Sequence, residues 1–203
     1  SHSFQQIGFY TEQVPTLGGT STPKLVTQVL YSSNPFDLLQ ARPTMGRTFL
    51  SGDSQPGHPN VVILADSVWR DVYHADSHIL GRPVSVDGIP YTVIGVMPAG
   101  FSFPASTGES SIWTPIPIGQ TSLQDRASSM LSVIGRLRPG VSIDAASHEM
   151  NSIHDQLKHE YPKDEDTNPV RVESYADVVT GSARPAIIAL DFAVFAVGLI
   201  ACA

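Results

Sequence analysis

The longest apolar stretch of the chain lies at its C-terminal end. Residues 186–203 read AIIALDFAVFAVGLIACA, with Asp191 as the one charged residue among them. Eighteen helical residues span about 27 Å, close to the roughly 30 Å hydrocarbon core of a bilayer. The pattern therefore predicts that residues 183–203 hold the first part of a transmembrane helix. The apolar residues expected in lipid are Ala186, Ile187, Ile188, Leu190, Phe192, Val194, Phe195, Val197, Leu199 and Ile200.

Asp191 keeps a second interpretation open, in which the run is a buried C-terminal helix of a soluble domain. A carboxylate at mid-membrane costs about 2.5–3.5 kcal/mol on insertion scales. Asp191, however, lies only about one and a half turns into the run, where headgroups and water still reach it. Arg184 and Pro185 directly before the run are typical of the start of a helix. We therefore expect the membrane span.

A strand followed by a short helix is predicted near the N-terminal end. The segment 25–31 (LVTQVLY) is rich in residues that favour strands. Asn34 and Pro35 follow, a pair typical of a helix N-cap and a first-turn proline. A short helix is therefore expected from this pair through Leu39.

A second strand and helix are predicted in the same order. The apolar run 60–64 (NVVIL) is typical of a buried strand. Asp66 or Ser67 can cap a helix over residues 68–73 because both side chains accept hydrogen bonds from free backbone amides.

The strongest local signal in the chain is a β-hairpin. Segments 83–87 and 89–97 carry alternating β-branched residues on either side of an Asp-Gly pair, which favours a two-residue hairpin turn. Two more strands are expected at 112–114 and 130–137, separated by a polar segment over 119–129 that is typical of a linker.

An amphipathic helix and a last strand complete the pattern. Ser142 can cap a helix that Pro162 ends, and a final strand is expected over 170–175. The whole pattern predicts an α+β fold. The apolar positions of this helix recur every three or four residues, at Ala146, Met150, Ile153, Leu157 and Tyr161.

Charge and cysteine content exclude several classes of protein. The formal net charge is −7, and the 12 Lys and Arg residues are scattered, which argues against binding to nucleic acid. Cys202 is the only cysteine, so an internal disulfide and a thiolate metal cluster are excluded. Because no signal peptide opens the chain, we expect the sequence to begin inside a longer protein.

Motifs for catalysis are incomplete. Residues 95–100 (GVMPAG) have the outer spacing of a phosphate-binding loop, but Phe101 stands where such a loop needs lysine. His148-Glu149 begins like a zinc-protease helix, but Ser152 occupies the position of the second ligand. We expect no enzyme activity, no cofactor and no bound metal, although a site built from distant residues would leave no such pattern.

Three aromatic residues in two segments are candidates for an interaction surface. They are Phe101, Phe103 and Trp113, the last beside Ile112. The alternative is that they fill the core of a small β-rich lobe, which needs large side chains to bury enough area. The core interpretation is the favoured one.

Several motifs together resemble a known family. Residues 34–49 (NPFDLLQARPTMGRTF), 61–69 (VVILADSVW) and 80–103 (LGRPVSVDGIPYTVIGVMPAGFSF) are similar to the MacB-like periplasmic core domain of ABC transporter permeases of the MacB and FtsX type. Residues 132–141 (SVIGRLRPGV) and 198–203 (GLIACA) resemble the continuation of that family into its second membrane helix. Within the family, the sequence looks like the duplicated permeases of Acidobacteria.

The resemblance implies a two-lobed extracytoplasmic domain. Residues 1–58 and 119–182 would form a porter-like lobe, and residues 59–118 an inserted, small β-rich lobe. The transmembrane helix would follow over 183–203.

The resemblance also implies a function and partners. The domain would lie on the periplasmic side of the bacterial inner membrane and transmit an ATP-driven conformational change for export or substrate extrusion. Its partners would be a second permease subunit or half, a cytoplasmic ATPase subunit or domain, and membrane lipid. Two alternatives remain, a membrane-anchored ligand-binding or sensing module and a membrane-tethered enzyme.

Overall fold

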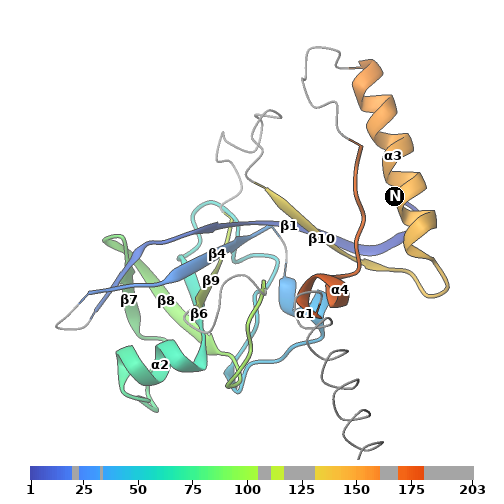
Figure 1. Cartoon of the computed structure of the whole chain (residues 1–203). Helices are drawn as coiled ribbons and strands as arrows, with labels where there is room; N and C mark the ends of the chain where they lie inside the picture. The colour runs from blue at the N-terminus through green and yellow to red at the C-terminus, as the bar shows by residue number, and fades with distance from the viewer. Residues whose placement is uncertain (20–22, 33, 105–110, 117–130, 161–168, 181–203) are drawn as a thin grey trace, which may run out of the picture. The chain divides into compact units, whose positions relative to one another are not determined.

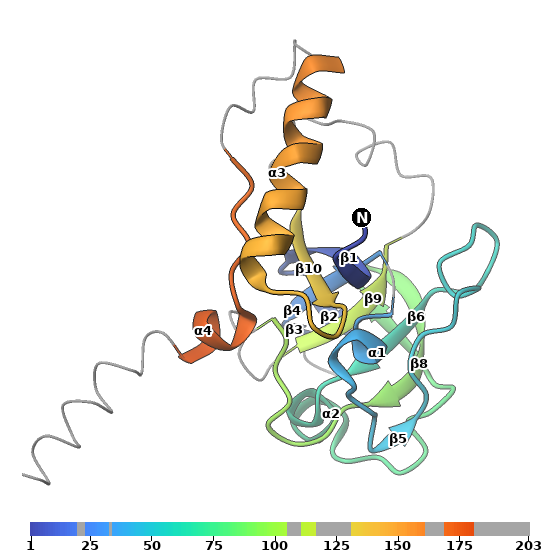
Figure 2. The same cartoon turned by 90° about the vertical axis from the view of Figure 1, so that its right-hand side faces the viewer.

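The computed structural model describes residues 1–19, 23–32, 34–104, 111–116, 131–160 and 169–180. Contacts within the chain divide it into two units. The strand-rich unit consists mainly of residues 2–138, and the helical unit mainly of residues 139–162 and 167–203. The mixture of strands and helices confirms the predicted α+β class (Figure 1, Figure 2).

Short strands make up most of the strand-rich unit. Its described residues form β1 (Phe4–Gln13), β2 (Thr16–Gly18), β3 (Lys24–Leu25), β4 (Thr27–Tyr31), β5 (Met45–Gly46), β6 (Val61–Leu64), β7 (Pro83–Val86), β8 (Ile89–Val96), β9 (Ser111–Pro115) and β10 (Ser132–Leu137). Its helices are α1 (Pro35–Leu39) and α2 (Asp66–Tyr73). The helical unit contains α3 (Ile143–Glu160) and α4 (Tyr175–Thr180). The strands predicted near 25–31, 60–64, 112–114 and 130–137 are confirmed.

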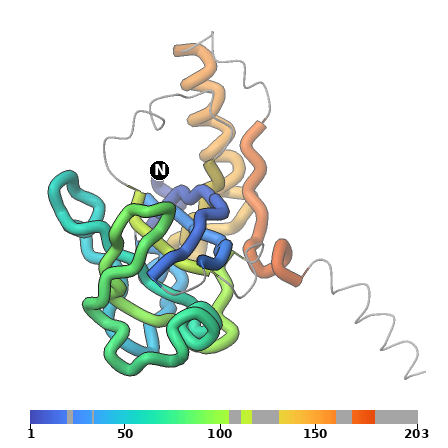
Figure 3. Tube along the Cα trace, turned by 90° about the vertical axis from the view of Figure 1, so that its left-hand side faces the viewer, coloured from blue at the N-terminus to red at the C-terminus, as the bar shows by residue number. Residues whose placement is uncertain are grey.

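All of these strands belong to one sheet, in the order β10-β1-β4-β9-β6-β8-β7-β2-β3, with β5 beside β8. The β4–β9 and β6–β8 pairs are parallel, and the other pairs are antiparallel. Because β2 closely follows β1, and β4 closely follows β3, the four strands form one long bent hairpin. In the strand order, β1 and β4 stand near one end of the sheet, and β2 and β3 stand at the other. Because the same hairpin supplies both ends, the sheet curls on itself (Figure 3).

The predicted hairpin is confirmed as β7 and β8. Asp87 (φ 49°) and Gly88 (φ 81°) form its turn, and two positive φ values are what a type I′ turn requires. The turn is also fastened to β2, because Asp87 Oδ1 accepts a 2.7 Å hydrogen bond from the Thr16 amide. The Asp87 amide in turn donates to the Thr16 carbonyl at 2.9 Å.

The predicted cap of α1 is also confirmed. Asn34 Oδ1 accepts a 3.2 Å hydrogen bond from the Phe36 amide, and Pro35 occupies the first turn. The Asn34 side chain also donates to the Phe49 carbonyl at 3.2 Å. One asparagine thus caps the helix and holds the segment that follows it.

The predicted start of α2 is wrong by two residues. The helix begins at Asp66, and its N-cap is Ala65 instead of Asp66 or Ser67. The Ala65 amide donates to the Ser111 carbonyl at 3.0 Å, which holds Ala65 extended at the C-terminal end of β6, so the helix starts directly after it. Asp66 instead lies in the first turn and pairs with Arg70 at 2.8 Å.

Two glycines allow β5 to lie against β8. Gly46 has φ 79°, and a Cβ atom there would overlap the Ile94 carbonyl oxygen. A Cβ atom on Gly95 would lie 2.6 Å from the Arg47 carbonyl oxygen. Any side chain at either position would therefore force the two backbones apart.

The helix α3 confirms the predicted amphipathic helix. Ser142 Oγ accepts a 3.1 Å hydrogen bond from the Ala145 amide, as an N-cap does. Along the predicted apolar face, Ala146 is buried, Met150 and Ile153 are half-buried, and Leu157 is exposed.

The strand predicted over 170–175 is wrong. Residues 169–174 pair with no described strand, and α4 begins at Tyr175. The Asn151 side chain accepts a 2.9 Å hydrogen bond from the Val170 amide and donates one of 2.9 Å to the Val170 carbonyl. The Asn151 side chain thus makes the two hydrogen bonds to the Val170 backbone that a neighbouring strand would otherwise make.

Two predicted segments, 119–129 and 183–203, lie outside the described residues. Among the residues that the structure describes, no helix is both long and apolar enough to cross a membrane. The division into lobes at residues 58/59 and 118/119 stays a prediction. Strand β4 of the predicted porter-like segment 1–58 pairs with strand β9 of the predicted inserted segment 59–118 in the same sheet.

Candidate functional site

The candidate aromatic residues lie mostly inside the protein. Trp113 and Phe103 are only 0% and 2% exposed, so both lie in the core, which was the favoured of the two interpretations. Trp113 Nε1 donates a 2.8 Å hydrogen bond to the Phe103 carbonyl, which fastens the loop after β8 onto β9. These aromatic residues are buried because a small β-rich core needs large side chains to bury enough area.

Phe101 is the half-buried member of the three. Its ring packs against Trp113 with 5.5 Å between centroids and against Phe36 with 6.0 Å. Phe101 also lines a cavity of about 190 Å³ together with the start of α2 and residues 98–100. An interaction role for Phe101 stays a prediction.

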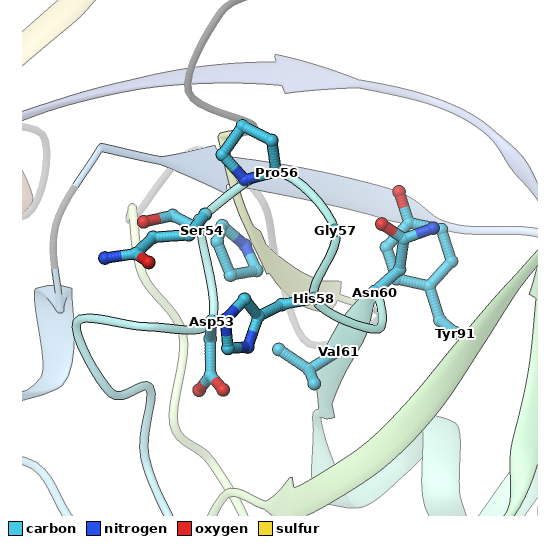
Figure 4. Close-up of a pocket in the computed structure, with 10 residues that line it drawn as sticks. Asp53, Ser54, Pro56, Gly57, His58, Asn60, Val61 and Tyr91 are labelled. Atoms are coloured by element: carbon cyan, nitrogen blue, oxygen red, sulfur yellow. The ribbon is translucent and has the colours of Figure 1, made fainter.

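A second concave site, which we call the loop crevice, was not indicated by any sequence motif. It has a volume of about 160 Å³, and residues 53–58 form one wall (Figure 4). The start of β6, Tyr91 of β8 and Pro115 of β9 form the rest. In Figure 4 Pro56 and Gly57 lie at the turn of the loop, and Ser54 and Tyr91 lie on opposite sides. The only sequence signal for such a loop is its density of turn-forming residues.

An ion pair holds the loop of the crevice in place. Arg47 contacts Asp53 at 2.6 Å, and Asp53 Oδ2 also accepts a 2.8 Å hydrogen bond from the Leu50 amide. Burial alone would raise the pKa of Asp53, but the hydrogen bonds from Arg47 and Leu50 outweigh burial and lower it. Asp53 is therefore ionised at neutral pH and acts as a structural anchor.

A polar network, buried at Gln28 and Thr114, reaches the crevice residue Tyr91. Gln13 Nε2 donates to Gln28 Oε1 at 2.7 Å, and Gln28 Nε2 donates to Thr114 Oγ1 at 2.7 Å. Gln28 and Thr114 are 1% and 0% exposed. Burial raises the pKa of Tyr91, and a hydrogen bond with Gln28 partly offsets the effect. All four side chains are neutral, so the network can orient a polar group but holds no charged acid or base.

The candidate metal ligands do not come together in the described part of the chain. Among those residues, no group of three or more His, Cys, Asp or Glu side chains could hold a metal ion. His148, His154 and His159 all lie on α3. The apolar residues proposed to lie in lipid, Ala186 through Ile200, are outside the described residues.

Comparisons with known proteins agree on one family. Residues 4–153 match the sequence model of the MacB-like periplasmic core domain. The fold is similar to the periplasmic region of MacB from Actinobacillus actinomycetemcomitans, with a TM-score of 0.61 at 17% identity over 81% of this chain and 71% of that one. The extracellular domain of the noncanonic ABC-type transporter YknZ from Gram-positive bacteria gives a TM-score of 0.54 at 18% identity over 79% and 78%. No protein with a curated description matches the chain.

Proposed function

The chain belongs to the MacB-like periplasmic core domain family, and we propose that it transmits an ATP-driven conformational change outside the membrane, as part of an ABC transporter permease. The match over residues 4–153 is the observation that carries this proposal. The transporter that contains the domain would carry out export or substrate extrusion. The domain itself would carry out no catalysis and need no cofactor.

The connections of the strand-rich unit suit such a mechanical role. The chain enters the unit through β1 and leaves it through β10, and residues 4–10 of β1 pair with residues 132–137 of β10. The Arg138 amide donates a 2.9 Å hydrogen bond to the Ser3 carbonyl, so the points of entry and exit lie side by side. A displacement of either connection therefore acts on the same pair of strands.

The interior of the unit can pass such a displacement on. All four residues of β6, at the middle of the sheet, are buried, and Trp113 and Phe36 pack edge to face with 5.8 Å between centroids. Close-packed interiors have low compressibility and transmit strain. The strand-rich unit should therefore move as one body instead of absorbing the motion.

The proposal includes a location and partners. The domain would lie on the periplasmic side of the bacterial inner membrane, anchored in lipid by residues 183–203. A second permease subunit or half would pair with it, and a cytoplasmic ATPase subunit or domain would supply the energy. The net charge of −7 argues against nucleic acid as a further partner.

One observation favours a second candidate, a membrane-anchored ligand-binding or sensing module. The loop crevice offers neutral and charged polar groups beside the aromatic Tyr91, which is the kind of lining that binds a small polar molecule. In that case the strand-rich unit would change position when a ligand binds in the crevice, and not when the ATPase binds nucleotide.

Distance measurement between two copies tests the proposal without knowledge of the substrate. Val133, 67% exposed on β10, is replaced by cysteine in a cysteine-free full-length permease that includes Cys202→Ser, together with its ATPase, and a spin label is attached. We expect the distance between the labels of two copies to differ between the nucleotide-free and ATP-trapped states. An ATPase variant that cannot bind nucleotide is the control. An unchanged distance during ATP turnover would exclude mechanical transmission by this domain.

A further inference from the structure

Arg136 ties the last strand of the strand-rich unit to the end of a buried helix. The residue lies half-buried on β10, and its Nε donates a 2.8 Å hydrogen bond to the Leu38 carbonyl near the end of α1. The last carbonyls of a helix have no partner within the helix itself. The Phe36 and Asp37 carbonyls accept hydrogen bonds from the amides of the next two residues after α1. Arg136 supplies the donor for the Leu38 carbonyl.

Helix α1 in turn contacts several parts of the interior. Phe36 is 0% exposed, and its ring packs against three other aromatic rings. The distances between centroids are 5.6 Å to Phe49, 6.0 Å to Phe101 and 5.8 Å to Trp113. These rings belong to the segment after α1, the loop after β8 and strand β9. A group bound to the end of α1 is therefore connected to three separate segments of the unit.

The sheet alone connects β10 to the same interior by a longer route. Among the described strands β10 pairs with β1 alone, and β1 and β4 separate it from β9. The hydrogen bond of Arg136 leads from β10 through α1 to Trp113 on β9 without either of these strands. Chains of packed side chains and hydrogen bonds of this kind carry energetic coupling through proteins. Because the chain leaves the unit through β10, a displacement of the exit meets this contact first.

The chemistry of arginine suits such a contact. Its guanidinium is planar and stays charged, and a hydrogen bond from a charged donor is stronger than a neutral one. Lysine carries a compact ammonium on a flexible stem, so it would keep the charge but not the fixed direction of the Nε donor. Glutamine would keep neither.

We propose that Arg136 couples β10 to the interior of the strand-rich unit, so that a displacement of the exit strand moves α1 and the aromatic rings around it. This proposal rests on the proposed function, because it needs a displacement that arrives along the chain. Arg136 is a coupling residue that acts through α1.

Spin labels on the two sides of the contact test the proposal. Val133 lies on β10, and Leu50 follows Phe49, whose ring packs against α1; the two side chains are 67% and 61% exposed. Each is replaced by cysteine in turn in the same cysteine-free full-length permease with its ATPase. In this parent we expect the distance between two copies to shift between the nucleotide-free and ATP-trapped states at both positions. In Arg136→Gln the shift should persist at position 133 and become several-fold smaller at position 50, while ATP hydrolysis continues.

Two further variants separate coupling from a general loss of stability. Arg82→Gln is the matched control, because it also removes a hydrogen-bonded arginine, one that donates to Asp76 Oδ2 at 3.0 Å on the surface. It should leave both shifts as in the parent. Arg136→Lys should give an intermediate shift at position 50, and it keeps the test decisive if Arg136→Gln does not fold. A purely structural role would lower the free energy of unfolding in Arg136→Gln but leave both shifts unchanged.

The outcomes distinguish this proposal from the proposed function. Equal shifts at position 50 in Arg136→Gln and the parent would overturn the coupling role and leave the proposed function intact. A parent that shifts at position 133 but not at position 50 would also overturn the coupling role. Loss of the shift at both positions in Arg136→Gln would do the same, because the effect would then not arise at the contact with α1. The absence of any shift in the parent would overturn both proposals.

Discussion

The strand-rich unit and the helical unit are held together in different ways. In the strand-rich unit every described strand pairs within one sheet, and several large side chains, such as Trp113 and Phe36, are fully buried. In the described part of the helical unit only Ala146 is buried, and the segment before α4 is held to α3 by one asparagine side chain. The first unit thus has one continuous, closely packed core, and the described part of the second depends on a few contacts.

The largest effect is expected from the core of the strand-rich unit. Trp113→Ala should lower the free energy of unfolding by about 3–5 kcal/mol, because it leaves a cavity and frees the Phe103 carbonyl. Val133→Ala on the exposed side of β10 should change it by less than about 0.5 kcal/mol. Urea unfolding of the full chain in detergent micelles measures both. Equal losses would contradict the burial of Trp113.

The close approach of β5 and β8 should give the next largest effect. Gly46→Ala should cost roughly 2–4 kcal/mol, because it combines an unfavourable φ with overlap against the Ile94 carbonyl. Gly57→Ala is the matched control: φ is also positive (86°), but no atom lies within 4 Å of its added Cβ. The difference between the two losses in the free energy of unfolding measures the cost of the overlap with the Ile94 carbonyl alone. If Gly57→Ala costs as much, the two strands do not lie as close as described.

A smaller and more local effect is expected in the helical unit. Asn151→Ala should cost about 1–2 kcal/mol and speed amide hydrogen exchange of Val170, because both hydrogen bonds to its backbone are lost. Asn151→Asp keeps the acceptor for the Val170 amide and should show an intermediate exchange rate. Exchange in β6 should not change in either variant. Faster exchange in β6 would show that the two units are not independent.

One further effect is absent at neutral pH and appears only at alkaline pH. Burial raises the pKa of Tyr73 from 10.0 to about 12, against a lowering by the nearby Arg82. Because the unfolded chain loses this proton first, the stability of the fold should fall as the pH rises from about 10 toward 12. Tyr73→Phe should flatten this part of the pH profile, although it also removes the 3.1 Å hydrogen bond to the Gly18 carbonyl. An equally steep profile in the variant would assign the pH dependence to other groups.

The features that sequence predicted correctly are local. Asn34 caps a helix that begins at the next residue, Pro35, and the Asp87-Gly88 turn is favoured by the positive φ values that its own two residues adopt. The family resemblance also came from contiguous motifs, and the match over residues 4–153 confirms it.

The features that sequence missed depend on distant partners. Along β1 apolar and polar residues do not alternate, and the strand exists because it pairs with both β4 and β10. Ala65 caps α2 because of a hydrogen bond to Ser111, and Val170 is kept out of a sheet by Asn151. The loop crevice likewise joins residues 53–58 to Tyr91 and Pro115, which no local pattern connects.

The most direct test of the rigid-body role compares two positions within one strand-rich unit. Leu50, 61% exposed, and Val133 are both replaced by cysteine in the same cysteine-free full-length permease and spin-labelled. The labelled protein is diluted with unlabelled copies so that only distances within one copy are measured. We predict the same narrow distance distribution in the nucleotide-free and ATP-trapped states. A distribution that shifts or broadens with nucleotide would contradict the account, because the unit would then deform instead of carrying the motion.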